Sequence, residues 1–295
     1  MNSIIKPVRT DYNTNIRLLE DIIKDFPFLN TEIQGRSPLG RGIFSFSIGN
    51  MKKSSLIAGG FHGTDYMSSL LLMLFTERLC RCVKYGSQMC GTEVKRALSK
   101  VGITIIPCIN PDGAEIAVKG FSAAKNLRGY LSDISPEGHT YWKANASGTD
   151  ISRNFCKGWA EYRQKEYERS SHFPSAVGFC GEYAESEAET RALTRLCRLK
   201  AFTRCMSLFP GENRLFHHTS ENIPAGSTMM GKILADSASC TFTDNCRNDE
   251  ATFGRWFSEE FSKPAFSLCT CSRSPDELYS IYERIEETLL LFLLF

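Results

Sequence analysis

The stretch that most constrains the fold is Leu56–Leu70, LIAGGFHGTDYMSSL, in which an apolar run ends at two glycines. Such a run indicates a buried strand leaving a sheet, and the apolar residues from Met67 onward predict the helix that follows. His62 and Asp65 then lie at the carboxyl end of a strand, the edge where open α/β sheets bind ligands. An imidazole and a carboxylate at this spacing can converge on one metal ion, although a hydrogen-bonded structural role is the plainer interpretation.

Strand and helix patterns alternate along the rest of the chain, which predicts an α/β sheet with helices on both faces. Strands are expected at 31–33, 43–48, 55–59, 101–109, 201–208 and 265–269. Helices are expected at 12–25, 68–85, 90–99, 182–199, 226–237, 253–261 and 275–295. The polar turn at 35–41 predicts an antiparallel hairpin between the first two strands, so the sheet should be mixed.

The domain organisation follows from the absence of a long polar linker. We expect one domain over 1–295, beginning with a helix and hairpin in 1–50. Residues 114–150 are rich in Gly, Ser, Asn and Asp, which predicts a long surface loop at the rim of the site. A shorter loop is expected at 241–251.

Charge and cysteine content exclude several classes of protein. The net charge is +2 with acidic and basic residues interspersed, so nucleic acid is not an expected partner. The longest apolar run near the end, Leu289–Phe295, is too short to span a membrane, and the first residues lack the apolar core of an export signal. The 12 cysteines include no C-x-x-C pair, which favours reduced thiols and a cytoplasmic location.

Several segments occur in an order that resembles one enzyme family. They are Gly35–Arg41, Gly59–Gly63 (GGFHG), Asn110–Gly113 (NPDG), Trp142–Asn145, Arg153–Phe155 and Glu185–Leu193. Together they resemble the zinc carboxypeptidase family, especially its bacterial branch of γ-D-glutamyl-diamino acid peptidases, which trim peptidoglycan stem peptides. The resemblance covers nearly the whole chain. It implies an α/β/α sandwich around a mixed, roughly eight-stranded sheet, with the site at the carboxyl edge of the strands.

The resemblance also assigns metal and catalytic positions. Family members hold zinc through a His, a Glu and a second His, and a separate Glu takes the proton of the zinc-bound water. His62 matches the first ligand, and Asp65 stands where the family has Glu. Phe209 stands at the third-ligand position and Cys269 at the general-base position. A phenyl ring cannot donate to a metal, so the resemblance implies that zinc binding is possible but weak or absent.

The positions that recognise a peptide end are better preserved. The resemblance implies that Arg153 binds a terminal carboxylate through two parallel hydrogen bonds, with Ser152 and Asn154 beside it. It also implies that Lys143 stands at the oxyanion position. We therefore expect a catalytically degenerate homologue that binds peptide or peptidoglycan-like termini, or a partner, through this cleft.

Two enzyme hypotheses stay open beside that one. An active metallocarboxypeptidase could hydrolyse peptide or γ-D-glutamyl-diamino acid bonds with substitute zinc ligands. The candidate substitutes are His139, His217 and His218, or Cys269 and Cys271 acting with His62 and Asp65. The other hypothesis makes Cys269 a nucleophile with His62 as its base. The sequence leaves open whether the protein is an enzyme.

Overall fold

A mixed sheet of eight strands organises the described part of the chain, in the order β1-β2-β6-β3-β7-β10-β8-β9. The structure is a computed structural model and describes residues 3–168, 173–219, 223–244, 249–272 and 274–295. The strands of this sheet are β1 (Asn30–Arg36), β2 (Gly42–Gly49), β3 (Ser54–Ala58), β6 (Gly102–Ile106), β7 (Cys205–Pro210), β8 (Arg214–His218), β9 (Thr241–Asp244) and β10 (Ala265–Thr270). A separate short hairpin consists of β4 (Gln88–Met89) and β5 (Thr92–Glu93).

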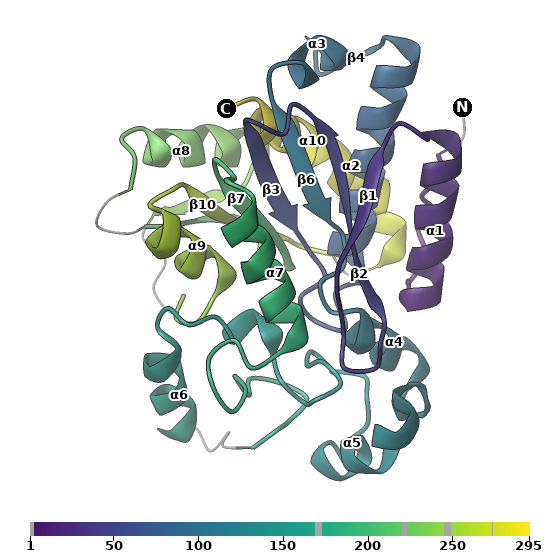
Figure 1. Cartoon of the computed structure of the whole chain (residues 1–295), viewed down its shortest axis with the longest axis vertical. Helices are drawn as coiled ribbons and strands as arrows, with labels where there is room; N and C mark the ends of the chain where they lie inside the picture. The colour runs from purple at the N-terminus through teal and green to yellow at the C-terminus, as the bar shows by residue number, and fades with distance from the viewer. Residues whose placement is uncertain (1–2, 169–172, 220–222, 245–248, 273) are drawn as a thin grey trace.

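Helices connect and cover the strands (Figure 1). The α-helices are α1 (Tyr12–Asp25), α2 (Tyr66–Tyr85), α3 (Val94–Leu98), α4 (Pro111–Lys119), α5 (Arg128–Ile134), α6 (Trp159–Glu168), α7 (Ala188–Leu199), α8 (Ser227–Ser237), α9 (Phe253–Phe261) and α10 (Leu278–Leu294). Short 3₁₀ turns occur at Phe121–Leu127, Ile151–Arg153 and Pro275–Glu277.

Strand direction explains where the site lies. β3 pairs in parallel with β6 and β7, and β7 pairs in parallel with β10. The carboxyl ends of these four strands therefore meet at one edge of the sheet. The expected hairpin of β1 and β2 is confirmed as antiparallel, and β8 is antiparallel to β10.

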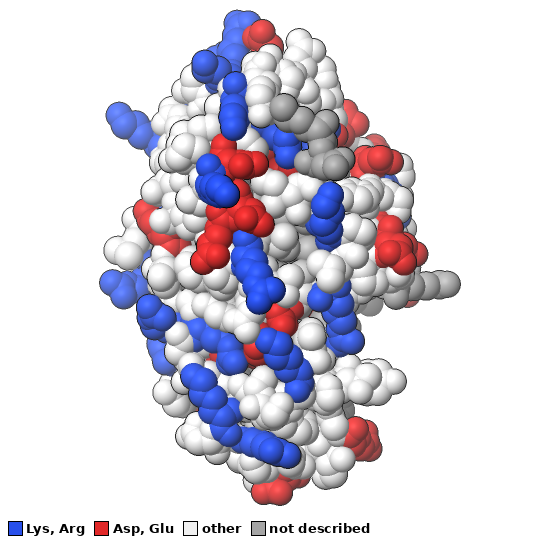
Figure 2. Space-filling model, turned by 90° about the vertical axis from the view of Figure 1, so that its right-hand side faces the viewer, with Lys and Arg blue, Asp and Glu red and all other residues white. Residues whose placement is uncertain are grey.

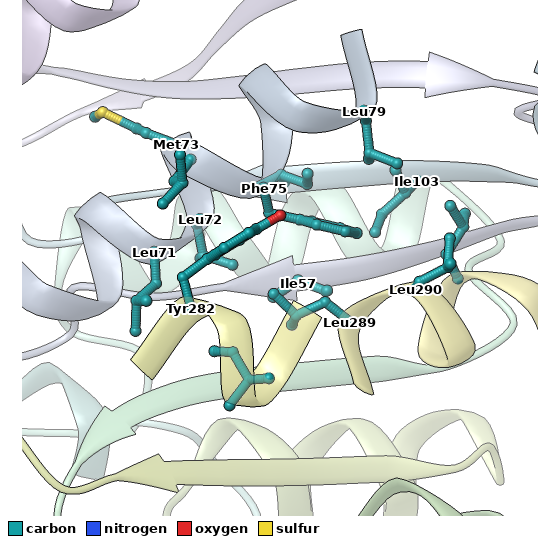
Figure 3. Close-up of a cluster of buried hydrophobic side chains, with 14 of the residues drawn as sticks. Ile57, Leu71, Leu72, Met73, Phe75, Leu79, Ile103, Tyr282, Leu289 and Leu290 are labelled. Carbon is teal, nitrogen blue, oxygen red and sulfur yellow. The ribbon is translucent and has the colours of Figure 1, made fainter. Parts of the chain in front are cut away.

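Side chains alternate between two apolar layers because a strand presents successive residues to opposite faces. Ile57 of β3 packs with α2 and α10, as Figure 3 shows, whereas Leu56 and Ala58 pack on the other face with residues of α7 and α9. Figure 1 shows α7 in front of the sheet and α2 and α10 behind it. The expected α/β/α sandwich with a mixed eight-stranded sheet is confirmed.

The segment 114–150 differs from the expected loop. It begins within α4 and contains a 3₁₀ turn and α5, which pack around a small apolar cluster of their own. Ile116, Leu131 and Trp142 are fully buried in that cluster. The segment is rich in Gly and Ser and has few apolar residues, so its sequence shows no clear helical pattern. Those few apolar residues nevertheless pack together and hold the helices.

The start of one helix and the presence of two strands also differ from the prediction. The expected helix at 182–199 begins only at Ala188, because Asn154 holds the residues before it: its Oδ1 accepts from Glu187 N at 3.1 Å and its Nδ2 donates to Tyr183 O. The strands β8 and β9 were not expected, and β9 occupies part of the loop predicted at 241–251. Both strands lie near one edge of the sheet, where pairing depends on the neighbouring strand.

Basic and acidic side chains stand side by side on the face seen in Figure 2. No helix among the described residues is both long enough and apolar enough to cross a membrane.

Candidate functional site

The loop after β3 brings His62 to the carboxyl edge of the sheet. The chain turns at Gly60, whose φ is +63°, and a Cβ there would lie 2.9 Å from the Cα of Cys108. Only glycine meets both the left-handed backbone and the close approach without strain. The turn then ends at Asp65, which begins α2 as its N-cap.

Asn110 ties this loop to the segment that carries Lys143. Its Oδ1 accepts from Gly113 N at 2.9 Å and so caps α4. Its Nδ2 donates to Phe61 O at 3.0 Å and to Ala144 O at 3.1 Å. One buried amide therefore fixes the backbones next to His62 and Lys143 relative to each other.

A cavity of about 390 Å³ opens at this edge. It is lined by most of the residues that the sequence singled out: His62, Lys143, Ser152, Arg153, Phe209 and Cys269. It is also lined by residues from β8, β10 and the start of α9, among them His218, Ser267 and Asp249. The structure thus brings together side chains that lie far apart in the sequence, from His62 to Cys269.

His62 belongs to a hydrogen-bonded group with Asp150 and Ser152. Ser152 Oγ donates to Asp150 Oδ1 at 2.6 Å and lies 3.2 Å from His62 Nε2. The Ser152 proton is used on Asp150, so His62 Nε2 donates to Ser152 Oγ and His62 Nδ1 is the unprotonated ring nitrogen. This Nδ1 is buried without a hydrogen-bond partner. Burial lowers the pKa of His62, Asp150 partly opposes this, and the charges of Lys143 and Arg153 lower it further. The imidazole is neutral at neutral pH.

Asp65 has a structural task at the start of α2. Its Oδ1 accepts from Ser68 N at 3.0 Å, the hydrogen bond of a helix N-cap. Its Oδ2 is buried and has no hydrogen-bond partner, and burial raises the pKa of the carboxyl to about 7. Asp65 is not among the residues that line the cavity.

Phe209, expected from the resemblance at the third-ligand position, packs beside His62. Its ring stacks on Phe61 with 5.0 Å between centroids and lies 5.6 Å from the ring of His62. Within the described residues, no three or more His, Cys, Asp or Glu side chains come close enough together to hold a metal ion. The residues present do not fit a three-ligand zinc site.

The substitute donors considered from the sequence lie in different places. His218 lines the cavity, but His217 faces the other side of the sheet, stacked on Phe266 and bonded to Asp244 at 2.7 Å. His139 packs edge-on against Phe121. Cys271 is exposed and is not part of the cavity lining. Cys269 lines the cavity from β10.

The expected carboxylate-binding residues separate into two groups. Arg153 lines the cavity; its guanidinium lies over the ring of Tyr162 and donates to Glu250 O at 3.0 Å. Ser152 and Lys143 line it as well. Asn154 is fully buried and donates to Cys180 O at 2.8 Å, so its side chain supports the chain before α7 and does not reach the cavity.

The sequence also left residues of this cavity unnoticed. Ser267 and Asp249 were not singled out, and His218 was considered only as a metal ligand. One signal pointed to Ser267: residues alternate along a strand, so it shares a face of β10 with Cys269. Nothing in the sequence connected it with Asp249.

The fold and the cavity together define an α/β/α protein of the carboxypeptidase-like class. Residues 16–226 match the family model described as zinc carboxypeptidase, and the chain belongs to that family. The family resemblance noted in the sequence is confirmed.

Known proteins show the same relation. The γ-D-glutamyl-L-diamino acid endopeptidase 1 of Lysinibacillus sphaericus is 23% identical over 262 residues, which are 88% of this chain and 64% of that protein. This chain thus spans less than two thirds of that curated relative. The structure of thrombin activatable fibrinolysis inhibitor has a TM-score of 0.75 at 16% identity, covering 97% of this chain and 74% of that one. Murein-tripeptide amidase MpaA from Escherichia coli O157 has a TM-score of 0.58 at 21% identity, covering 89% and 91%. These two structures show the shared fold alone.

Proposed function

We propose that this protein binds the carboxyl-terminal end of a peptide in the cavity, with Arg153 holding the terminal carboxylate, and without the zinc ion of its family. One observation carries the proposal: Arg153 and Lys143 line the same cavity as the apolar ring of Phe209, which lies beside His62 and by the resemblance replaces a metal donor. An arginine matches a carboxylate with two parallel hydrogen bonds, and a desolvated cavity strengthens them. The protein is then a degenerate homologue that has kept recognition.

The name of one relative supports a class of ligand. It is an endopeptidase for γ-D-glutamyl-L-diamino acid bonds, so we propose a γ-D-glutamyl-diamino acid peptide, of the kind found in peptidoglycan. The described cysteines are all free, which supports the proposal of a reducing compartment such as the cytoplasm.

The binding proposal predicts a loss of affinity when the cation is removed. We expect Arg153→Met to weaken binding of a γ-D-glutamyl-diamino acid peptide by at least about 30-fold, because the ligand carboxylate loses its charged hydrogen bonds. Methionine keeps an apolar stem next to Tyr162, the ring that the guanidinium covers. Isothermal titration calorimetry measures the change.

Two controls make this test specific. The same peptide with a carboxyl-terminal amide should bind the wild-type chain as weakly as the free acid binds Arg153→Met. Arg17→Met removes an exposed cation from α1 and should leave the affinity unchanged. Equal affinity of acid and amide for the wild-type chain would contradict the proposal.

The active metallopeptidase is the second candidate, and one observation favours it. His62 Nδ1 and Asp65 Oδ2 are both buried without a hydrogen-bond partner, and such atoms are costly unless something binds them. Our proposal predicts less than about a tenth of an equivalent of zinc after supplementation and buffer exchange, because two donors hold the ion weakly. Elemental analysis gives the content. A full equivalent that a chelator removes together with peptide hydrolysis would favour the enzyme.

A further inference from the structure

Three polar side chains on the β8 side of the cavity form a continuous chain of hydrogen bonds. Ser267 Oγ lies 2.8 Å from His218 Nε2, and His218 Nδ1 lies 3.0 Å from Asp249 Oδ2. An ionised carboxylate only accepts, so in the neutral imidazole Nδ1 donates to Asp249 and Nε2 accepts from the Ser267 hydroxyl. This order of groups is the one that activates a serine as a nucleophile, whatever the fold.

Strand register brings the serine and the histidine together. β8 and β10 are antiparallel, with Phe216 opposite Ser267 and His218 opposite Ala265. Residues two apart on a strand share a face, so His218 lies diagonally beside Ser267 at a distance that side chains bridge. Asp249 reaches the imidazole from the segment just before α9, and all three polar residues line the cavity.

The helix α9 leaves room for the imidazole at Gly254. A Cβ at this position would lie 2.2 Å from His218 Cδ2 and 2.4 Å from its Nε2. Glycine in a helix costs about 1 kcal/mol relative to alanine. Gly254 is therefore a weak helix former at a position where any larger residue would clash with the His218 ring.

The surroundings of the three residues suit a nucleophile and its base. His218 is 3% exposed and Ser267 is 7% exposed, so most of their surface is shielded from water, and the exposed part faces the cavity. Arg255 Nη1 lies 3.9 Å from Asp249 Oδ1, so a positive charge stands beside the carboxylate that holds His218. Ser207 Oγ lies 2.7 Å from Ser267 Oγ and 3.4 Å from Phe266 O, and when it donates to Ser267 the Ser267 proton is left for His218.

We propose that Ser267 is the nucleophile of an acyl-transfer reaction on carboxylic esters in this cavity, with His218 as general base and Asp249 as positioning residue. Ser267 Oγ bonds to the ester carbonyl carbon while its proton passes to His218 Nε2. The bond to the alcohol oxygen then breaks, and the alcohol leaves with that proton. Water then attacks the acyl carbonyl carbon and gives a proton to His218 Nε2. The bond from this carbon to Ser267 Oγ breaks, Oγ takes the proton from His218, and the acid departs. Lys143 and Arg153 supply positive charge in the same cavity for the oxyanion.

A fluorophosphonate tests this reaction directly, because Ser267 Oγ would displace fluoride and form a stable bond to phosphorus. We expect one adduct per wild-type chain in the intact mass, located at Ser267 by peptide mapping. Ser267→Ala should remove the adduct, and His218→Asn should slow its formation at least about 100-fold. This labelling does not require peptide binding by Arg153, so the two proposals can fail separately.

Matched variants separate chemistry from folding. Ser55→Ala removes a buried hydroxyl of β3 that does not line the cavity and should keep labelling within a few-fold. Asp249→Asn should slow labelling strongly and Asp249→Glu should recover part of it, at equal thermal midpoints of the two variants. The wild-type map decides the matter even where a variant fails to fold. Absence of an adduct on Ser267, or an unchanged rate in His218→Asn, overturns the proposal.

Discussion

Replacing Asp112 by alanine should lower the free energy of unfolding by about 3–5 kcal/mol, as expected when one partner of a buried ion pair is removed. The carboxylate is fully buried and accepts from Ser37 Oγ at 2.7 Å, Leu39 N at 2.9 Å and Arg41 Nη1 at 2.7 Å. Without it, the guanidinium of Arg41, whose side chain is only 12% exposed, loses its carboxylate partner. Urea unfolding followed by circular dichroism measures the difference.

An exposed ion pair serves as the control for Asp112. Glu32 and Lys200 are 3.3 Å apart with both side chains substantially in water, so Glu32→Gln should cost less than about 1 kcal/mol. An Asp112→Ala variant within 1 kcal/mol of the wild type would contradict the expected role of the buried pair. The position matters for the cavity too, because Asp112 ties the β1–β2 hairpin to the turn that contains Asn110.

Local patterns were sufficient for the centre of the sheet. Every residue of β3 (SSLIA) and β6 (GITII) is buried and most are apolar, and the glycines after β3 mark a turn that only glycine allows. These signals lie within a few residues of each other, so the sequence predicts them without knowledge of the rest. The hairpin of β1 and β2 was predicted for the same reason.

Long-range packing decided what the sequence could not predict. β8 contains two adjacent histidines and an arginine, which is not a typical strand pattern. It forms a strand because its backbone pairs with that of β10. The helices in 114–150 depend on Trp142, which arrives from outside them to complete their apolar cluster. Hydrogen bonds between distant residues are equally invisible to a local pattern.

The candidate site shows the same division. The resemblance to a family grouped His62, Lys143, Arg153 and Phe209, and the structure brings these four to one cavity. It also grouped Asp65, whose position directly before a helix fits an N-cap equally well, and the structure has that cap. A residue at a family position keeps its place on the backbone, whereas the atoms it contacts depend on the surrounding side chains.

Glu189→Gln should stabilise the protein above neutral pH, by up to about 4 kcal/mol at pH 8.5. Glu189 is fully buried near the start of α7; its Oε2 accepts from Asn145 Nδ2 at 3.2 Å and its Oε1 has no partner. Burial, with the nearby charges of Glu187 and Asp112, raises the pKa of this carboxyl to about 8 from an ordinary value of 4.5. Glutamine keeps the shape and the acceptor and carries no charge to desolvate.

The sign of the pH dependence follows from where the proton is held. Between about pH 4.5 and pH 8 the native chain keeps a proton on Glu189 that the unfolded chain has released, so stability falls as the pH rises through this window. Urea unfolding at a series of pH values should therefore show the wild type and Glu189→Gln converging near pH 4 and separating above it.

Glu185 provides a control of opposite sign on the segment before the same helix. Burial alone would raise its pKa, but hydrogen bonds and charge from Arg198, at 3.0 Å, lower the pKa below its usual value. Its ionised form stabilises the native state above about pH 4.5, and this contribution is lost as the pH falls, so Glu185→Gln should be less stable than the wild type at pH 8. If Glu189→Gln gains no more stability at pH 8.5 than at pH 4.5, the buried carboxyl does not hold its proton in the native state.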